Sequence, residues 1–320
     1  MQQPIKWGVL GYARIAHQWV IPAIVCANNA VPYAIASRSE DKLQEAKERF
    51  GFEKLYSSYE ALLEDPDVQA VYIPLPNGLH KEWAIKAAQH GKHVLCEKPL
   101  ALTAADCEEI AAAARENKVK VMEAFMYRYT ARTKKVQELL KAGVIGEIKH
   151  ISSTFRIPLT DKGDVRMDPT MGGGSLWDVG CYPINFIGMF TQEHPEDFCV
   201  LKREEQGVDI SLSAVLRYKS GIIATVNSGF DSCSLQLTEI NGTNGTILLR
   251  DTFVDKDTPV QVFTGREKSL TEYPVEVSER YVLEVEDFSA AVLEDREPLF
   301  SMEETIRNNG LIDELLKAAK

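Results

Sequence analysis

Short apolar runs alternate with segments of helical pattern through the first 124 residues, and this alternation limits the possible folds more than any other feature of the sequence. Parallel strands need a crossover of a dozen or more residues, and a helix usually supplies it. The pattern therefore predicts an α/β domain with a doubly wound parallel sheet over residues 1–124. The predicted strands are Ile5 to Leu10, Val31 to Ser37, Ala70 to Ile73, His93 to Glu97 and Lys120 to Glu123.

Polar residues mark the ends of the intervening helices. Ser39 is suited to cap one helix, and Thr103 with Asp106 forms a capping box before an alanine-rich stretch. A third helix is predicted from His80 to Gln89 and ends near Gly91, because glycine readily adopts the left-handed conformation that follows a helix.

The pattern changes after a helix predicted over Arg132 to Ala142. Apolar residues then alternate with period two, and turns such as Lys219-Ser220-Gly221 and Asn244-Gly245 join the runs. We expect a second, α+β domain over residues 125–320, with a large and mostly antiparallel sheet and a C-terminal helix that can pack back on the first domain. Its predicted strands are Ile148 to Phe155, Ile210 to Tyr218, Ile222 to Gly229, Leu235 to Ile240 and Thr246 to Leu249, and its last helices are Tyr281 to Leu293 and Ser301 to Ala319.

Composition excludes several classes of protein. The formal net charge of -11 argues against a nucleic-acid partner, because phosphates favour clustered Lys and Arg. The six cysteines include no C-x-x-C pair, so we expect neither thiol redox chemistry nor a metal site. The first apolar run is too short for a signal peptide, and no stretch approaches the roughly 20 apolar residues that span a membrane. We expect a cytoplasmic protein without a membrane partner.

The first predicted strand leads into a glycine-containing turn. Gly11, Ala13 and Ala16 occupy the three small-residue places of a G-x-G-x-x-G/A fingerprint, with Ala at the second place. Small residues there let a dinucleotide pyrophosphate approach the N–H groups of a helix N-terminus, which is the Rossmann arrangement. The predicted contacts run from Gly11 through Tyr12, Ala13 and Arg14 to Ile15. A tight strand-to-helix turn without a ligand is the alternative.

Ser37 and Arg38 follow the second predicted strand, where an NAD-specific site usually has an acidic residue. A guanidinium at this place suits the 2′-phosphate of NADP. The sequence therefore favours NADP as cofactor, with NAD as the alternative if Arg38 is an ordinary solvated arginine.

A proline-rich turn, Pro74-Leu75-Pro76-Asn77-Gly78, follows the strand that ends at Ile73. Ligands of such sheets bind at the carboxyl ends of the strands. Pro74, Leu75, Asn77 and His80 are therefore candidate cofactor contacts. For His80, the alternative is a helix N-terminal residue that binds no ligand.

Glu97 and Lys98 end the next strand and are followed by Pro99. Charged residues seldom end a buried strand without cause. Both are candidate cofactor contacts, and a lysine here can bind a substrate hydroxyl or lower the pKa of a neighbouring acid. A surface ion pair is the alternative.

A flexible glycine run, Gly172-Gly173-Gly174, precedes a segment of helical character that contains Asp178 and Tyr182. Residues four apart share one face of a helix. A carboxylate and a phenol presented together are suited to binding a polyol and moving its proton. The alternative is a capping aspartate followed by a core tyrosine.

Taken in this order, these motifs resemble the Gfo/Idh/MocA oxidoreductase family over nearly the whole chain. The most specific are Glu97-Lys98-Pro99, Pro76 to His80, Glu123 to Arg128, and Gly172 to Tyr182. The resemblance implies a Rossmann domain followed by an open-faced sheet domain that commonly mediates oligomerisation. Tyr182 stands where many inositol dehydrogenases of the family have His, and so resembles the branch of dimeric dihydrodiol dehydrogenase, glucose-fructose oxidoreductase and NADP-linked xylose dehydrogenase.

The resemblance also implies an activity, namely hydride transfer between NAD(P) and a sugar or sugar-like polyol, with an aldose 1-dehydrogenase favoured. In this hypothesis Tyr182 is the general acid/base, Lys98 assists it, and Asp178 binds a neighbouring hydroxyl. The rivals are a trans-dihydrodiol or inositol dehydrogenase, and a regulatory or sensor protein that binds the dinucleotide without turnover. We expect a homodimer or homotetramer that associates through the C-terminal sheet.

Overall fold

The computed structural model describes residues 3–254, 256–265, 267 and 269–320. The chain divides into two compact units, Met1–Met126 with Tyr281–Ile306, and Tyr127–Arg280 with Arg307–Lys320. The division near residue 126 lies close to the expected boundary at 124. The structure differs from that expectation in returning Tyr281–Ile306, which the sequence analysis assigned to the second domain, to the first unit.

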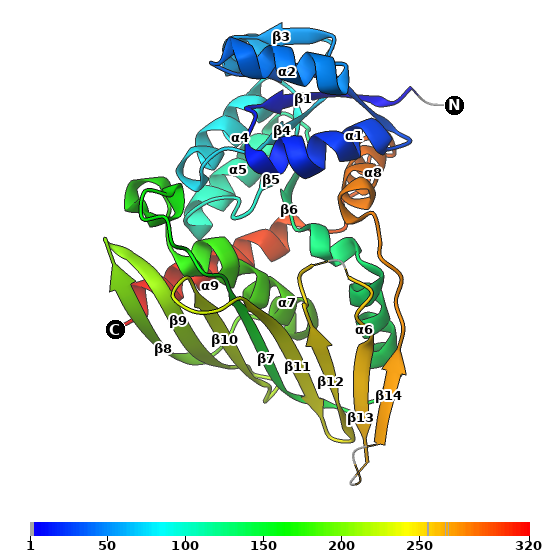
Figure 1. Ribbon diagram of the computed structural model, residues 1–320, viewed down its shortest axis with the longest axis vertical. Coiled ribbons are helices and arrows are strands. Elements are labelled where there is room, and N and C mark those ends of the chain that lie inside the picture. The colour runs from blue at the N-terminus through cyan, green and yellow to red at the C-terminus, as the bar shows by residue number, and fades with distance from the viewer. Residues whose placement is uncertain (1–2, 255, 266, 268) are drawn as a thin grey trace. The chain divides into compact units, whose positions relative to one another are not determined.

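The first unit contains a six-stranded parallel sheet, and it confirms the predicted doubly wound fold (Figure 1). The strand order is β3-β2-β1-β4-β5-β6, so the direction of winding reverses between β1 and β4, where ligands of such sheets bind. Only β3, which has three half-buried residues, was absent from the prediction. The strands are β1 Ile5–Leu10, β2 Ala30–Ala36, β3 Lys54–Tyr56, β4 Ala70–Ile73, β5 His93–Glu97 and β6 Val121–Ala124.

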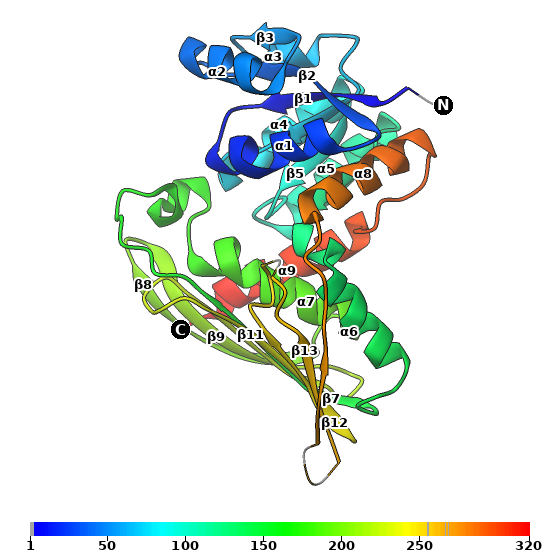
Figure 2. The ribbon, with the colours of Figure 1, turned by 45° about the vertical axis from the view of Figure 1, so that its right-hand side comes forward.

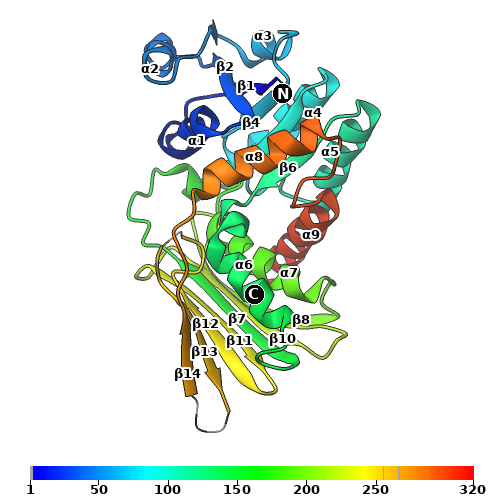
Figure 3. The ribbon, with the colours of Figure 1, turned by 90° about the vertical axis from the view of Figure 1, so that its right-hand side faces the viewer.

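Helices pack on this sheet, and the predicted caps are confirmed. The Ser39 hydroxyl accepts a hydrogen bond from the Lys42 amide, and the Thr103 hydroxyl accepts one from the Asp106 amide. Helix α8 lies beside the sheet of this unit (Figure 3). It contributes to the same core, because Phe288 packs on Trp7 of β1 with ring centroids 5.6 Å apart. The helical segments of the first unit are η1 Ala16–Val20, α1 Ile21–Cys26, α2 Glu40–Phe50, α3 Tyr59–Leu63, η2 Asn77–Leu79, α4 His80–Gln89, α5 Ala104–Glu116 and α8 Arg280–Leu293. The segments η3 Met126–Tyr129 and α9 Met302–Ala318 begin in the first unit and continue in the second.

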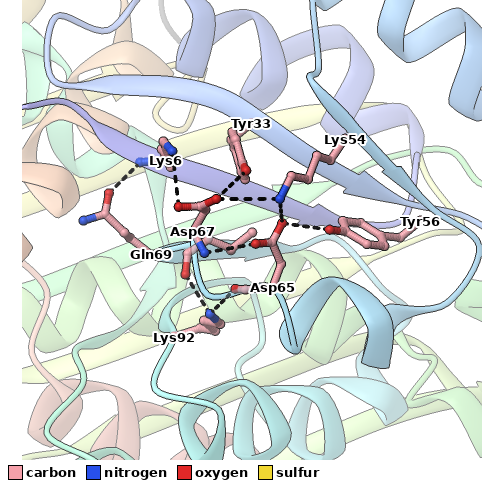
Figure 4. Close-up of polar contacts among 9 residues, drawn as sticks. Lys6, Tyr33, Lys54, Tyr56, Asp65, Asp67, Gln69 and Lys92 are labelled. Atoms are coloured by element: carbon pink, nitrogen blue, oxygen red, sulfur yellow. Dashed lines mark hydrogen bonds and ion pairs between the residues drawn. The ribbon is translucent and has the colours of Figure 1, made fainter.

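A buried carboxylate, Asp65, organises the amino edge of the parallel sheet (Figure 4). It accepts hydrogen bonds from Lys54 at 2.9 Å and from the Tyr56 hydroxyl at 2.7 Å, while the buried Lys92 ammonium donates to its main-chain oxygen at 2.6 Å. Burial raises the pKa of Asp65, but its hydrogen bonds, including one from the Asp67 amide, together hold it below the usual value. The cluster stabilises the edge opposite the one where ligands of such sheets bind.

The second unit contains an eight-stranded sheet in the order β14-β13-β12-β11-β7-β10-β9-β8, whose strands are labelled in Figure 1. Figure 2 shows the same sheet from another side. Among the strand pairs of the described residues in this sheet, only β7–β10 is parallel, so the predicted mostly antiparallel sheet is confirmed. The strands are β7 Ile148–Arg156, β8 Asp197–Glu205, β9 Val208–Arg217, β10 Ile223–Gly229, β11 Leu235–Gly242, β12 Gly245–Arg250, β13 Val260–Thr264 and β14 Ser269–Tyr273.

One face of this sheet packs against helices and the other is open. Helices α6 Ala131–Lys141 and α7 Cys181–Thr191 cover the inner face, on which Ile151 and Val226 are fully buried. The outer face carries half-buried polar side chains, and the Thr225 hydroxyl donates to that of Ser152 at 2.8 Å. Among the described residues, no helix combines the length and apolar character that a membrane span requires.

Candidate active site

The turn after β1 has the geometry that a dinucleotide pyrophosphate needs. Gly11 has φ +107°, a conformation that strains any residue with a side chain. The helical segment begins directly afterwards, because the His17 amide donates to the Ala13 carbonyl at 3.1 Å. The N–H groups of Arg14 and Ile15 thus lie in a first turn, where no intrahelical acceptor is available. The phenol of Tyr12 donates to Glu45 instead, which leaves only its main chain for a cofactor.

Ser37 and Arg38 lie at the same part of the sheet edge as Gly11. The Ser37 hydroxyl accepts a hydrogen bond from the Ser39 amide at 3.2 Å, and Arg38 is exposed. Tyr59 lies near both positions. A Cβ on Gly11 would be 3.4 Å from the Tyr59 hydroxyl, and the charge of Arg38 affects the pKa of the same hydroxyl. Burial raises the pKa of Tyr59, and the Arg38 charge opposes that rise. The residue set fits the adenosine side of NADP.

The proline-rich turn after β4 also reaches this place. Pro74 is buried, and a Leu75 methyl group would lie 3.4 Å from a Cβ on Gly11. Asn77 is half-buried and begins the short η2 helix. Leu75 therefore borders the turn that carries Gly11.

His80 has a different role from the predicted cofactor contact. Its ring is fully buried, with Nδ1 2.7 Å from the Pro99 oxygen and Nε2 2.7 Å from the Leu75 oxygen. Both nitrogens are therefore engaged by the main chain, and no ring nitrogen remains for a cofactor. Instead, His80 joins the turn after β4 to the turn after β5.

Lys98 is half-buried and follows β5 directly, between segments of main chain that buried groups fix. The Tyr72 hydroxyl donates to Glu97 at 2.6 Å, and the buried Glu123 carboxylate accepts from the Leu100 amide at 2.8 Å. Sequence reasoning gave neither Tyr72 nor Glu123 this positioning role. The sequence does contain a clue to both residues, because each is a polar residue within an apolar strand, and buried polar groups need hydrogen-bond partners.

In the second unit, Asp178 lies in the segment η6 Leu176–Gly180, and α7 continues from it, which confirms the predicted helical character. The Arg166 Nε donates to the Asp178 carboxylate at 2.7 Å, and the guanidinium also pairs with Asp164. The charge of Asp178 raises the pKa of Arg166, so the pair is ionic. Sequence analysis missed Arg166, because a single arginine in a long loop has no pattern.

Tyr182 is 7% exposed, and aromatic rings surround its own ring. The centroids of Phe155, Phe253 and Tyr127 lie 5.3, 5.4 and 5.9 Å away. This packing is what the core-tyrosine alternative requires, and it also gives a catalytic phenol a fixed orientation.

The glycine run before this segment packs closely, in contrast to the flexible segment that we expected. A Cβ on Gly173 would be 2.6 Å from the Arg166 carbonyl oxygen, and one on Gly174 would overlap the Asp209 carboxylate. Gly174 also has φ +121°. These glycines are therefore explained by close approach of the backbone to other groups.

Lys98 belongs to the first unit, and Asp178 and Tyr182 belong to the second. The structure brings Lys98 together with Glu97, the turn at Pro74 to His80 and, through Leu75, the glycine turn. In the second unit it places Asp178 and Tyr182 on one continuous helical segment. Within the described parts of the chain, no cluster of three His, Cys, Asp or Glu side chains could hold a metal ion.

Two family models match the chain. Residues 5–125 match the oxidoreductase family with an NAD-binding Rossmann fold, and residues 133–248 match the GFO/IDH/MocA C-terminal domain.

Individual relatives match over almost the whole chain. D-xylose 1-dehydrogenase (NADP(+)) 2 of Haloferax volcanii is 35% identical over 99% of this chain and 98% of its own. A 3-ketoreductase from Actinomadura kijaniata, solved with NADP and TDP-benzene, is 34% identical over 99% of this chain and 98% of its own, with a TM-score of 0.93. The trans-1,2-dihydrobenzene-1,2-diol dehydrogenase of Xenopus tropicalis is 33% identical over 76% of this chain and 74% of its own.

Proposed function

Because this chain belongs to the Gfo/Idh/MocA oxidoreductase family, we propose that it transfers hydride between NADP and a sugar or sugar-like polyol, as an aldose 1-dehydrogenase does. The observation that carries the proposal is Lys98, whose flanking main chain is fixed by buried partners at the ligand-binding edge of a Rossmann sheet. Buried groups that fix the main chain on both sides of one side chain are typical of a functional site. The likeness to an NADP-linked xylose dehydrogenase supports the substrate class.

The proposed cofactor residues follow from the edge geometry. Main-chain N–H groups from Tyr12 to Ile15 hold the pyrophosphate, which the missing side chain of Gly11 lets approach, and Ser37 with Arg38 holds the 2′-phosphate. The nicotinamide half is bordered by Pro74, Leu75, Asn77, Glu97 and Lys98. When bound, NADP supplies or receives the hydride at nicotinamide C4.

The remaining chemistry belongs to side chains of this protein. Tyr182 exchanges a proton with the reacting hydroxyl, and Asp178, held ionised by Arg166, accepts a hydrogen bond from a neighbouring hydroxyl. Lys98 orients the substrate, and its positive charge stabilises the phenolate form of the acid/base.

Replacing Arg38 should change cofactor preference. Arg38→Ala removes a charge-assisted contact to the 2′-phosphate, which is worth about 1.5–3 kcal/mol, so the Kd for NADP should rise about 10- to 100-fold. The Kd for NAD should change less than about twofold, because NAD lacks that phosphate. Fluorescence titration of the reduced cofactors measures both. Lys42→Ala, another exposed cation nearby on α2, is the control; an unchanged NADP-to-NAD ratio in Arg38→Ala would contradict the assignment.

A substrate panel tests the activity. Purified protein is mixed with NADP or NAD and with aldoses, inositols and cyclic trans-diols, and the absorbance of the reduced nicotinamide is followed. A dTDP-linked keto sugar with NADPH tests the reverse direction, which the similarity to the 3-ketoreductase favours. NADPH formation with aldoses alone supports the proposal. Tight NADPH binding without turnover of any compound would favour a sensor protein.

We also propose that the open face of the second sheet forms a homodimer or homotetramer. This face carries large apolar side chains, and Leu201, Val215 and Ile223 are 64%, 48% and 44% exposed on three adjacent strands. Apolar patches of this kind mark association surfaces. Light scattering at micromolar concentration should give a multiple of 35.8 kDa, and Leu201→Glu should lower it. A monomeric wild type would contradict this proposal.

A further inference from the structure

One buried carboxylate of the second unit, Asp209 of β9, has no part in the mechanism above. It is 4% exposed. Its Oδ2 accepts hydrogen bonds from the Ser175 hydroxyl at 2.7 Å and from the Leu176 amide at 2.8 Å. Both donors lie where the segment that carries Asp178 and Tyr182 begins.

Asp209 takes the place of a helix cap for that segment. The first amides of a helix need acceptors from outside it, and a side chain at the N-cap usually supplies one. In the described structure Ser175, the N-cap residue, makes no side-chain cap bond to its own helix. Its hydroxyl instead bonds Asp209 and lies 2.9 Å from the Ser228 hydroxyl, and the Asp209 carboxylate accepts from the helix amide. A negative charge is also favourable at this end of a helix.

The glycine run makes this contact possible and connects it to the proposed catalytic residues. A side chain at Gly174 would overlap the Asp209 carboxylate. The Gly174 amide donates to the Arg166 carbonyl at 2.9 Å, and the Arg166 guanidinium binds Asp178. The position of the first turn therefore affects both the Arg166–Asp178 pair and the start of the helix on which Tyr182 lies.

We propose that Asp209 is a positioning residue, whose ionised carboxylate fixes the first turn of the segment carrying Asp178 and Tyr182 and whose protonation releases that turn. The inference rests on the proposed function, because it assigns catalytic value to those two side chains.

Burial has a larger effect on the pKa of Asp209 than the charged groups around it. Burial raises the pKa of Asp209 to about 6, against the opposing effects of its hydrogen bonds and of Lys202. On the adjacent strand β8, Lys202 pairs with Glu204 at 2.7 Å, and on the helical side Asp178 is paired with Arg166. The strand β10 contributes the neutral Ser228.

The sign of the effect on stability follows from this rise. An unfolded aspartate has a pKa of about 3.9, so the folded state holds its proton more tightly between about pH 4 and pH 6. The contribution of Asp209 to the free energy of unfolding is therefore greatest below about pH 4, falls as the pH rises to about 6, and is constant above. Ionisation of Asp209 therefore lowers the free energy of unfolding of the protein. In the proposal, the folded protein with ionised Asp209 is the active form.

The first experiment does not depend on turnover. The amide resonance of Leu176 is followed by two-dimensional NMR between pH 5 and pH 8. In wild type it should shift with a midpoint near pH 6, and the shift should be absent in Asp209→Asn, which keeps one acceptor oxygen but does not titrate. Asp197→Asn, which removes an exposed carboxylate of β8, is the control and should retain the midpoint. A Leu176 amide that does not titrate in wild type overturns the proposal.

Ser175→Ala provides a second variant in case Asp209→Asn does not fold. It leaves the carboxylate in place and removes one of its donors, so the ionised form loses stabilisation. The Leu176 midpoint should move upward by about 0.5 to 1 pH unit. A midpoint that stays unchanged in Ser175→Ala overturns the proposal.

Activity then tests the positioning role. In wild type, kcat should show a fall of about tenfold per pH unit below the same midpoint, and Asp209→Asn should have a lower kcat that lacks this limb and keeps only the pH dependence set by the Tyr182 phenol. An Asp209→Asn profile that keeps a limb at the Leu176 midpoint overturns the positioning role even if Leu176 titrates. If the substrate panel gives no turnover, the proposed function fails, and with it the catalytic value of this titration, whereas the NMR result still decides whether Asp209 controls the first turn.

Discussion

Tyr182→Phe is expected to lower kcat by about 10²- to 10⁴-fold, the usual contribution of a positioned proton transfer. The ring is held by three aromatic neighbours, so phenylalanine should occupy the same place and only the hydroxyl should be lost. The KM for NADP should change little, because the hydroxyl is not among the proposed cofactor contacts. Steady-state kinetics in which NADP and the sugar are varied in turn, each with the other at saturation, measures both constants.

The matched control is Tyr127→Phe in the same aromatic cluster. The Tyr127 hydroxyl donates to the buried Asn185 side chain at 2.5 Å, so its removal should lower the free energy of unfolding by about 1–3 kcal/mol. Its kcat should stay within about tenfold of wild type, since the proposed mechanism does not use this phenol. Equal losses of kcat in both variants would indicate that the cluster acts only through packing.

Lys98→Ala should lower kcat by a similar factor, about 10²- to 10⁴-fold, and should also change the pH dependence. The proposed mechanism assigns the Lys98 charge to stabilising the phenolate, so without it the phenol becomes a weaker acid and the residual activity should move to higher pH. The Kd for NADPH should stay within about tenfold, because most of the proposed contacts to the cofactor come from other residues. Stopped-flow absorbance at several pH values measures the rate of the hydride step.

Lys81→Ala is the control for this variant. Lys81 is also a lysine of the first unit, and its ammonium pairs with Asp106 and Glu109 at the surface. Exposed ion pairs contribute about 0–1 kcal/mol to stability, so this variant should fold and keep a kcat close to that of wild type. Turnover by Lys98→Ala at the wild-type rate, with the same pH profile, would remove Lys98 from the mechanism.

The parallel sheet could be predicted almost completely from the sequence. The predicted bounds of β4, β5 and α4 agree with the structure, because buried parallel strands are short continuous apolar runs separated by capped helices. The strands missed in the second unit were β8, β13 and β14. Two of these lie at the sheet edges, where charged and exposed side chains replace the alternation that identifies inner strands.

The proposed site residues Arg38, Asn77 and Lys98 were predicted because each comes after a strand of the parallel sheet, and the carboxyl ends of such strands meet at one edge. The groups that hold the site were missed. Glu123 and Asp209 bond amides that lie 23 and 33 positions away, and nothing in the periodicity of either strand specifies those partners.

The return of Tyr281–Ile306 to the first unit limits how this protein can be shortened or recombined. The chain passes between its units after residues 126, 280 and 306. A gene truncated after codon 126 would encode all six parallel strands, yet Trp7 would lose the Ser289 hydroxyl that accepts its indole N–H at 3.2 Å and the Phe288 ring beside it. Residues 1–126 therefore lack part of the core of the first unit. A chimera that exchanges this unit between relatives must carry the matching segment Tyr281–Ile306 as well.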